Sequence, residues 1–176
     1  FRAIKLEPQN GHTHADVRCF FEDINGNMLI GTGSGIYVID KEGQLTRHYD
    51  TRNSGIGEDN VHSISRDSQG NYWIGTFGQG LSILSPAMKR IKNYHTNNGF
   101  CSNAINHILH VGRGIMAVAT SAGLVVFDNG KTTTFTKRDG LVNQQIRAIA
   151  IDSNQLLWLS TNKGLAYIDY KTRRVM

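Results

Sequence analysis

The feature that most constrains this chain is a repeat that occurs four times along its 176 residues. The repeat is clearest in the sequence VHSISRDSQGNYWIGTFGQGL, which begins at Val61 and ends at Leu81. The threonine within it recurs at spacings of 44, 44 and 41 residues, as Thr32, Thr76, Thr120 and Thr161. Self-similarity at a fixed period of this length is the signature of a repeat architecture, so it limits the fold before any single residue does.

Each copy shares further residues with the others at fixed distances from the threonine. An aspartate stands nine residues before it in three copies: Asp23, Asp67 and Asp152. A large apolar residue stands three residues before it in the same copies: Leu29, Trp73 and Trp158. A glycine follows shortly after it in all four: Gly35, Gly80, Gly123 and Gly164. The third copy has Val111, Ala117 and Ala119 in place of the aspartate, the tryptophan and a glycine, so we expect its sheet to pack with smaller side chains.

The pattern within one copy predicts four short strands. Apolar runs alternate with turn sequences at intervals of roughly 8 to 12 residues, which is typical of strands joined in series. In the second copy, residues 61–67 are followed by a turn of the sequence DSQGN and by a second strand over 71–76. A third strand begins at the recurring glycine, and a fourth, more polar strand carries an aromatic residue. No stretch shows a helical period.

Four antiparallel strands in 40-odd residues make one sheet that cannot bury both faces alone, and radial stacking of such sheets gives a β-propeller. We therefore predict an all-β fold: a β-propeller fragment of four four-stranded antiparallel blades, part of a larger or dimer-completed propeller. The expected boundaries are 1–15 for an end strand or loop of a preceding blade, 16–57, 58–101 and 102–142 for blades 1, 2 and the degenerate blade 3, and 143–176 for a truncated blade 4.

The two ends of the chain extend this expectation. The last residues, 173–176, lie partway into an expected fourth strand, and Phe1 has the aromatic character that this strand lacks. The chain therefore reads as a segment of a longer repeat array. Because an incomplete array leaves sheet edges and a blade face uncovered, we expect it to associate with the remaining blades of a receptor or with a second copy as a homodimer.

The pattern V-x-x-I-x-x-D-x-x-G-x-x-W-I-G-T-x-x-x-G-L resembles the two-component regulator propeller repeat, which occurs in the sensory region of bacterial hybrid two-component sensor histidine kinases. The resemblance covers residues 16–170, and it departs in the third copy and in the fourth, where DSNQLLWLST lacks the turn glycine. The resemblance implies the periplasmic sensor region of an inner-membrane protein, often one that responds to oligosaccharides. The chain itself has no kinase motif.

Charge and apolar content exclude two classes of partner. The formal net charge is +5, but the basic residues occur singly or in short pairs, which is typical of solvated loops. We therefore expect no nucleic-acid partner. No stretch of about 18 apolar residues is present, so we expect no direct membrane contact by this segment.

Cysteines and histidines give no expected metal or cofactor site. Cys19 and Cys101 occupy unrelated positions of the repeat, so free thiols are expected. His12 and His14 would share one side of an extended segment, but only Asp16 lies near enough to be a third ligand. His107 and His110 would point to opposite faces of a strand. The glycine-rich run at 31–35 precedes a strand rather than a helix, so it is expected to be a hairpin turn and not a phosphate-binding loop.

The recurring residues are expected to be structural, because a residue that occurs once per blade holds each blade in the same way. Aspartates at turns cap the backbone, and the tryptophans are expected to be buried between blades. The structural set comprises Asp23, Asp67, Asp152, Trp73, Trp158, Gly35, Gly80, Gly123 and Gly164. Ligand binding is expected where the copies differ, on the rim formed by the second-to-third and fourth-to-first connections.

The candidate ligand-binding residues are polar groups near the start of each inner strand together with rim residues. They are Arg18, His62, Asn106, Arg147, Phe77, Gln79 and Lys163. Polar donors beside an aromatic ring suit a sugar, which stacks on the ring and is oriented by hydrogen bonds.

Three functions are compatible with these residues. The first is an extracytoplasmic ligand-recognition segment of a two-component sensor histidine kinase, responding to oligosaccharides. The second is a scaffold or dimerisation segment of the same receptor that binds no ligand. The third is a propeller lyase or glycosidase, which is disfavoured because most of the acidic residues fall at turns or strand ends.

Overall fold

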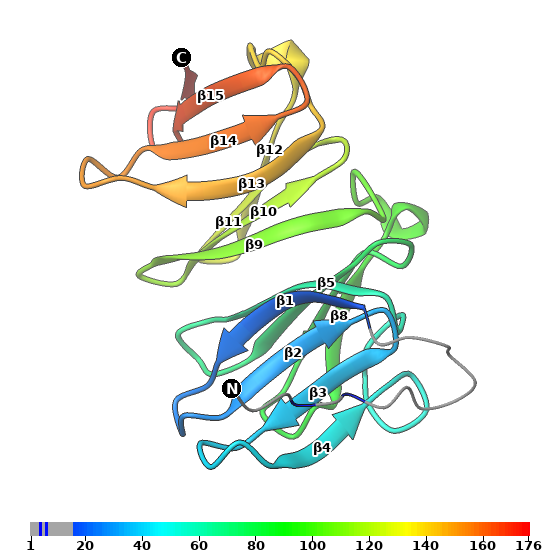
Figure 1. Ribbon diagram of the computed structural model, residues 1–176. Coiled ribbons are helices and arrows are strands. Elements are labelled where there is room, and N and C mark those ends of the chain that lie inside the picture. Colours follow the sequence, from blue (N-terminus) through cyan, green and yellow to red (C-terminus); the bar gives the residue numbers. More distant parts are fainter. Residues whose placement is uncertain (1–3, 5, 7–15) are drawn as a thin grey trace.

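A computed structural model describes Ile4, Leu6 and residues 16–176 of the chain. The expectations for Phe1, for the segment 1–15 as a strand or loop, and for His12 and His14 lie outside the described residues, apart from Ile4 and Leu6. The described residues form four antiparallel sheets of four strands each (Figure 1). The prediction of an all-β fold with four four-stranded blades is therefore confirmed.

Each sheet contains four strands that are consecutive in the sequence. Blade 1 contains β1 (Val17–Glu22), β2 (Met28–Thr32), β3 (Gly35–Ile39) and β4 (Leu45–Tyr49). Blade 2 contains β5 (Val61–Arg66), β6 (Tyr72–Thr76), β7 (Leu81–Leu84) and β8 (Arg90–Tyr94). Blade 3 contains β9 (Ile105–Gly112), β10 (Ile115–Thr120), β11 (Gly123–Asp128) and β12 (Lys131–Phe135). Blade 4 contains β13 (Ile146–Ile151), β14 (Leu157–Thr161), β15 (Gly164–Asp169) and the short β16 (Arg174–Val175).

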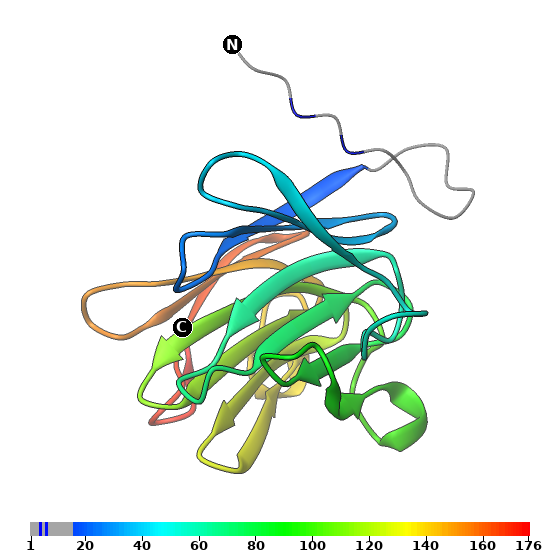
Figure 2. The same ribbon diagram turned by 90° about the horizontal axis from the view of Figure 1, so that it is seen from below.

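The blades stack face to face in chain order, with their first strands side by side (Figures 1 and 2). Two short 3₁₀ helices, η1 (Thr96–Asn98) and η2 (Lys137–Asp139), lie in the return loops that follow β8 and β12. This arrangement brings β1, β5, β9 and β13 next to one another. The second residue of each of these strands is one of the candidate polar residues: Arg18, His62, Asn106 and Arg147.

Three apolar layers between the blades form the core. The first layer joins Leu29, Ile36 and Val38 of blade 1 to Val61 and Ile74 of blade 2. The second layer includes Trp73, Leu81 and Ile83 of blade 2, which pack on β9, β10 and β11 of blade 3. Burial of these side chains removes apolar surface from water, which is the main stabilising contribution to a repeat fold of this kind.

The third layer shows how the degenerate blade packs. Ala117 and Ala119 are fully buried, and the larger Leu157, Leu159 and Ile168 of blade 4 pack in the same cluster. The loss of volume in blade 3 is therefore balanced by leucine and isoleucine side chains on the facing sheet, as close packing of a protein interior requires.

The first hairpin of each blade uses one of two turns. In blade 2, Asp67 Oδ1 accepts hydrogen bonds from the backbone N–H groups of Gln69 and Asn71 at 2.9 Å, and Asp23 and Asp152 accept the equivalent bonds in blades 1 and 4. Blade 3 lacks the aspartate. Its strand β9 continues to Gly112, and a two-residue turn of Arg113 and Gly114, both at positive φ, reverses the chain.

The outward face of blade 4 differs from the expectation for Trp158. Trp73 is 6% exposed, but Trp158 at the equivalent position is 39% exposed. Leu165 is 69% exposed, although its counterparts Ile36, Leu81 and Leu124 are fully buried. The reason is that each counterpart is covered by the following blade, whereas the outward face of blade 4 has no blade packed on it in the described part of the chain.

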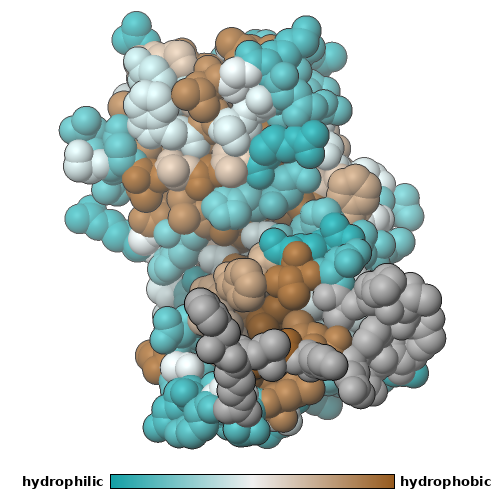
Figure 3. All heavy atoms as spheres, viewed as in Figure 1, coloured by the Kyte–Doolittle hydropathy of each residue, from teal (hydrophilic) through white to brown (hydrophobic). Residues whose placement is uncertain are grey.

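The outward face of blade 1 is partly covered. Ile30, Tyr37 and Ile39 are buried in a small cluster against which Leu6 packs, whereas Phe20 is largely exposed. Figure 3 shows hydrophobic residues at the surface over this sheet. Among the described residues, no helix is long and apolar enough to cross a membrane.

Candidate functional site

The rim predicted from the sequence is formed by turns and return loops that are hydrogen-bonded to each other. The loop that returns to blade 2 accepts bonds at Asp59 O and Asn60 O from the backbone N–H groups of Gly35 and Phe77. The same pairing recurs at the other junctions, from Gly80 to Asn103, Ser121 to Ala104 and Asn162 to Gln145. These bonds place the second-to-third turns and the fourth-to-first loops on one edge of the stack.

Recurring glycines and threonines shape this edge. The Thr76 hydroxyl donates to Gly80 O at 3.0 Å, and the Thr32, Thr120 and Thr161 hydroxyls make the equivalent bond to Gly35, Gly123 and Gly164. Gly80 has a φ of +79° and lies against the carbonyl of Tyr94, the last residue of β8. Positive φ at these positions suits glycine because it has no Cβ.

His62 and Phe77 form the centre of the candidate site. His62 is the second residue of β5, and Phe77 follows the end of β6. Their rings are stacked, with centroids 5.2 Å apart and planes 27° from parallel. Phe77 is 52% exposed, so part of an aromatic face is available to a ligand.

Two charged side chains act on the imidazole of His62. Burial is the largest cause that lowers the pKa of His62, and the positive charge of Arg18 lowers it further, whereas the carboxylate of Glu58 opposes both. Glu58 is itself oriented by the backbone N–H of Gly78, which donates to its Oε2 at 2.6 Å. We call Arg18, Glu58, His62 and Phe77 the rim cluster. A neutral imidazole offers one donor and one acceptor, so the cluster can stack on a ligand and hydrogen-bond it.

The remaining candidates do not join the rim cluster. Asn106 donates to Ile146 O at 2.7 Å, and so links the inner strands of blades 3 and 4. Arg147 donates to Asn162 Oδ1 at 2.7 Å, and Asn162 also contacts Gln145. Lys163 and Gln79 are exposed on their turns, where their backbone N–H groups donate to Thr161 and Thr76.

Glu58 is a site residue that sequence reasoning missed. The sequence feature that could have identified Glu58 is its position in a return loop, since the copies differ in these loops. A carboxylate in such a loop is usually solvated, and only the folded turn at Gly78 shows that Glu58 is held beside His62.

Other reactive groups in the described residues do not gather into a site. No group of three His, Cys, Asp or Glu side chains among them could hold a metal ion. Cys19 and Cys101 are free thiols, and burial raises the pKa of Cys19 to about 11. His107 is tied into the fold, because its Nδ1 accepts the backbone N–H of Ile149 at 3.1 Å.

Comparison with known proteins agrees with the repeat. The family model described as two component regulator propeller matches residues 55–78 and 140–163, which belong to the second and fourth copies. No protein with a curated description matches the chain.

Several solved structures resemble the chain. The extracellular domain of a putative hybrid two component system from B. thetaiotaomicron has 41% identity over 99% of this chain, with a TM-score of 0.91. The extracellular domain of a second such system from that organism has 20% identity over 97% of the chain and a TM-score of 0.77. The chain spans 24% and 26% of these two structures. Virginiamycin B lyase from Staphylococcus aureus has 16% identity over 92% of the chain and 55% of its own, with a TM-score of 0.70, a likeness that shows the fold alone.

Proposed function

This chain contains repeats of the two component regulator propeller family, and from that premise we propose that it belongs to the ligand-recognition region of a two-component sensor histidine kinase. The region lies outside the cytoplasm, in the periplasm, and is carried by an inner-membrane protein. The likeness to extracellular domains of hybrid two component systems supports this proposal. The segment contributes recognition, and the kinase chemistry belongs to other parts of such a receptor.

The main support for a recognition role is the set of chemical groups in the rim cluster. It combines a half-exposed aromatic ring, a neutral imidazole, a cation and a carboxylate on one edge of blades 1 and 2. An oligosaccharide has both apolar C–H faces and many hydroxyl groups, so it can use all four groups together. We therefore propose an oligosaccharide as the ligand.

Calorimetry on the receptor's extracellular region with a panel of oligosaccharides tests this proposal. Phe77→Ala and His62→Ala should each weaken binding of a responding sugar by about fivefold, since an aromatic contact and a hydrogen bond are each worth on the order of 1 kcal/mol. Lys131→Ala, on the outer strand of blade 3, serves as the control and should bind normally. Unchanged binding in both rim variants would place the ligand elsewhere in the receptor.

A scaffold role is the second candidate, and the exposed outward face of blade 4 favours it. Leu165 and Trp158 lie on this face, and the equivalent faces of blades 1 to 3 are each covered by another blade. In this role the segment packs on a further blade or a second copy, and no sugar binds to the rim. Loss of assembly in Leu165→Asp, together with unchanged sugar binding in Phe77→Ala and His62→Ala, would favour the scaffold role over recognition at the rim.

An enzymatic role is not proposed. Glycoside hydrolysis commonly uses two carboxylates on either side of the scissile bond, and Glu58 is the one carboxylate in the rim cluster. The likeness to a lyase lies below 25% identity and carries no activity. Chromatography of the same oligosaccharides after incubation with the protein should show no new products.

A further inference from the structure

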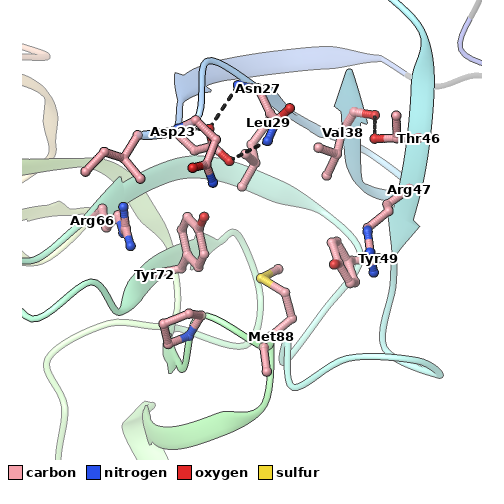
Figure 4. Close-up of a pocket in the computed structure, with 14 residues that line it drawn as sticks. Asp23, Asn27, Leu29, Val38, Thr46, Arg47, Tyr49, Arg66, Tyr72 and Met88 are labelled. Atoms are coloured by element: carbon pink, nitrogen blue, oxygen red, sulfur yellow. Dashed lines mark hydrogen bonds between the residues drawn. The ribbon is translucent and has the colours of Figure 1, made fainter. Parts of the chain in front are cut away.

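A pocket lies between blades 1 and 2, on the edge that bears the first hairpins and so opposite the rim cluster. It has a volume of about 480 Å³. Figure 4 shows Asp23, Asn27 and Leu29 along one side and Tyr72 and Met88 opposite them. Neither the repeat pattern nor the proposed function assigns a role to this pocket.

One departure from the repeat changes the side chains that line this pocket. In blade 2, Trp73 lines the corresponding groove, which has a volume of about 430 Å³. Its Nε1 donates to Asp67 Oδ2 at 2.9 Å, and its ring lies edge-on to that of Phe127 of blade 3, with centroids 5.0 Å apart. Trp158 makes the same 2.9 Å bond to Asp152 in blade 4. Blade 1 has Leu29 at this position, so no indole reaches Asp23.

Asp23 has the same carboxylate oxygen, Oδ2, that accepts the indole N–H from Trp73 in blade 2 and from Trp158 in blade 4. Its Oδ1 accepts hydrogen bonds from the backbone N–H groups of Asn25 and Asn27. Its Oδ2 accepts a hydrogen bond from the Asn27 side chain at 2.9 Å. Burial opposes ionisation of this carboxyl, but the bonds from Asn27 and Asn25 and the charge of Arg66 outweigh burial and lower its pKa. Asp23 is therefore an ionised acceptor at the wall of the pocket.

The rest of the lining suits a planar ring that carries a negative charge. Leu29, Val38 and Met88 supply apolar surface, and Tyr49 and Tyr72 supply aromatic faces. Arg66 is committed to its own hairpin, because its Nε donates to Gly70 O at 3.0 Å and its guanidinium lies 5.6 Å from the Tyr72 ring. Arg47 is exposed on β4 at the side of the pocket and adds a second guanidinium.

We propose that this pocket binds a small aromatic anion that carries a ring N–H donor, with the N–H bonded to Asp23 and the anionic group paired with Arg47. The ring takes the place that the indole of Trp73 holds between blades 2 and 3. This site is independent of the sugar site proposed for the rim.

Titration of the purified protein with indole-3-acetate, followed by amide NMR, tests the proposal. We expect saturable shifts at Asn27 and Tyr72 and none at His62 or Phe77. Indole, which lacks the carboxylate, should cause the same shifts with weaker binding. Shifts confined to the rim, or no saturable shift with either compound, would overturn the proposal.

Two variants test the proposed contacts. Leu29→Trp introduces the residue that blades 2 and 4 carry at this position and should abolish binding while keeping the native melting transition. Arg47→Ala changes an exposed side chain and should weaken indole-3-acetate binding about tenfold, as expected for loss of a charge-assisted bond, while leaving indole binding unchanged. Should Leu29→Trp fail to fold, Arg47→Ala still decides: equal binding of indole-3-acetate to this variant and to the native protein would contradict the proposed pairing.

Discussion

The two tryptophans occupy the same place in the repeat but different surroundings. Trp73 is buried between blades 2 and 3, and Trp158 is 39% exposed on the outward face of blade 4. We expect Trp73→Ala to lower the free energy of unfolding by about 3 to 5 kcal/mol, because it leaves a cavity and removes the indole hydrogen bond to Asp67. Trp158→Ala removes the bond to Asp152 and the contact with Tyr167, and should cost about 1 to 2 kcal/mol. Urea denaturation of both variants measures the difference, and equal losses would contradict it.

His62 should make the stability depend on pH in a defined direction. Burial and Arg18 hold its pKa in the folded protein below the usual 6.5. The unfolded chain therefore takes up the proton first as the pH falls through 6.5, so this residue costs stability at low pH and none above pH 7. We expect the unfolding free energy of the native protein to fall more steeply between pH 7 and 5 than that of His62→Gln. Parallel curves for the two proteins would show that the imidazole titrates alike in both states.

At the scale of one residue, the sequence predicts that His62 and Phe77 lie near the same rim, and the structure places their rings side by side. His62 and Phe77 were recognisable because one followed the first apolar residue of a strand and the other interrupted a glycine-rich turn. The stacking of their rings was beyond sequence reasoning, since it depends on how β5 and the turn after β6 approach each other. The use of Asn106 as a link to Ile146 O was hidden for the same reason, because its partner is 40 residues away.

At the scale of a strand or turn, local chemistry accounts for most of the fold. Turn aspartates, glycines and alternating apolar runs act within a few residues, so the strands of all four blades follow from the pattern. The first hairpin of blade 3 is different, because Val111 cannot cap a turn, and its two-residue turn rests on Arg113 and Gly114 at positive φ. The sequence marked this copy as degenerate without predicting which turn replaces the lost one.

The recurring glycines give a prediction at this same scale. A Cβ at Gly80 would lie 2.0 Å from Tyr94 O, whereas a Cβ at Gly164 would meet nothing within 4 Å, since the chain past β15 does not approach it. Both residues have positive φ, which costs about 1 to 2 kcal/mol for any other L-residue. Gly164→Ala should therefore lose about this amount, and Gly80→Ala should lose more because β8 must also shift. Thermal unfolding distinguishes them, and a smaller loss in Gly80→Ala would be inconsistent with this packing.

At the scale of the whole molecule, the sequence predicts the stack of blades but not its closure. Each interface is repeated, so three copies of it determine how a blade packs on its neighbour. Closure of a propeller depends on the small rotation between neighbouring blades, which no single repeat encodes. The outward face of blade 4 exposes Trp158 and Leu165, whose counterparts in blade 2 are buried against the next blade.

We expect this face to drive association of the chain with a second copy. Leu165 is 69% exposed, although the repeat places a fully buried residue at this position in blades 1 to 3. Burying such a side chain contributes about 1.5 to 3 kcal/mol, so Leu165→Asp should raise the dissociation constant of the dimer by at least about tenfold. Ile91→Asp, at an exposed apolar position on β8, is the matched control and should associate as the native chain does. Sedimentation equilibrium over a range of concentrations measures both variants. Two outcomes would contradict this prediction: a native chain that stays monomeric at high concentration, or an equal effect of the two substitutions. Either would show that this face does not pair with a second copy, and a further blade of the receptor would then be the proposed partner.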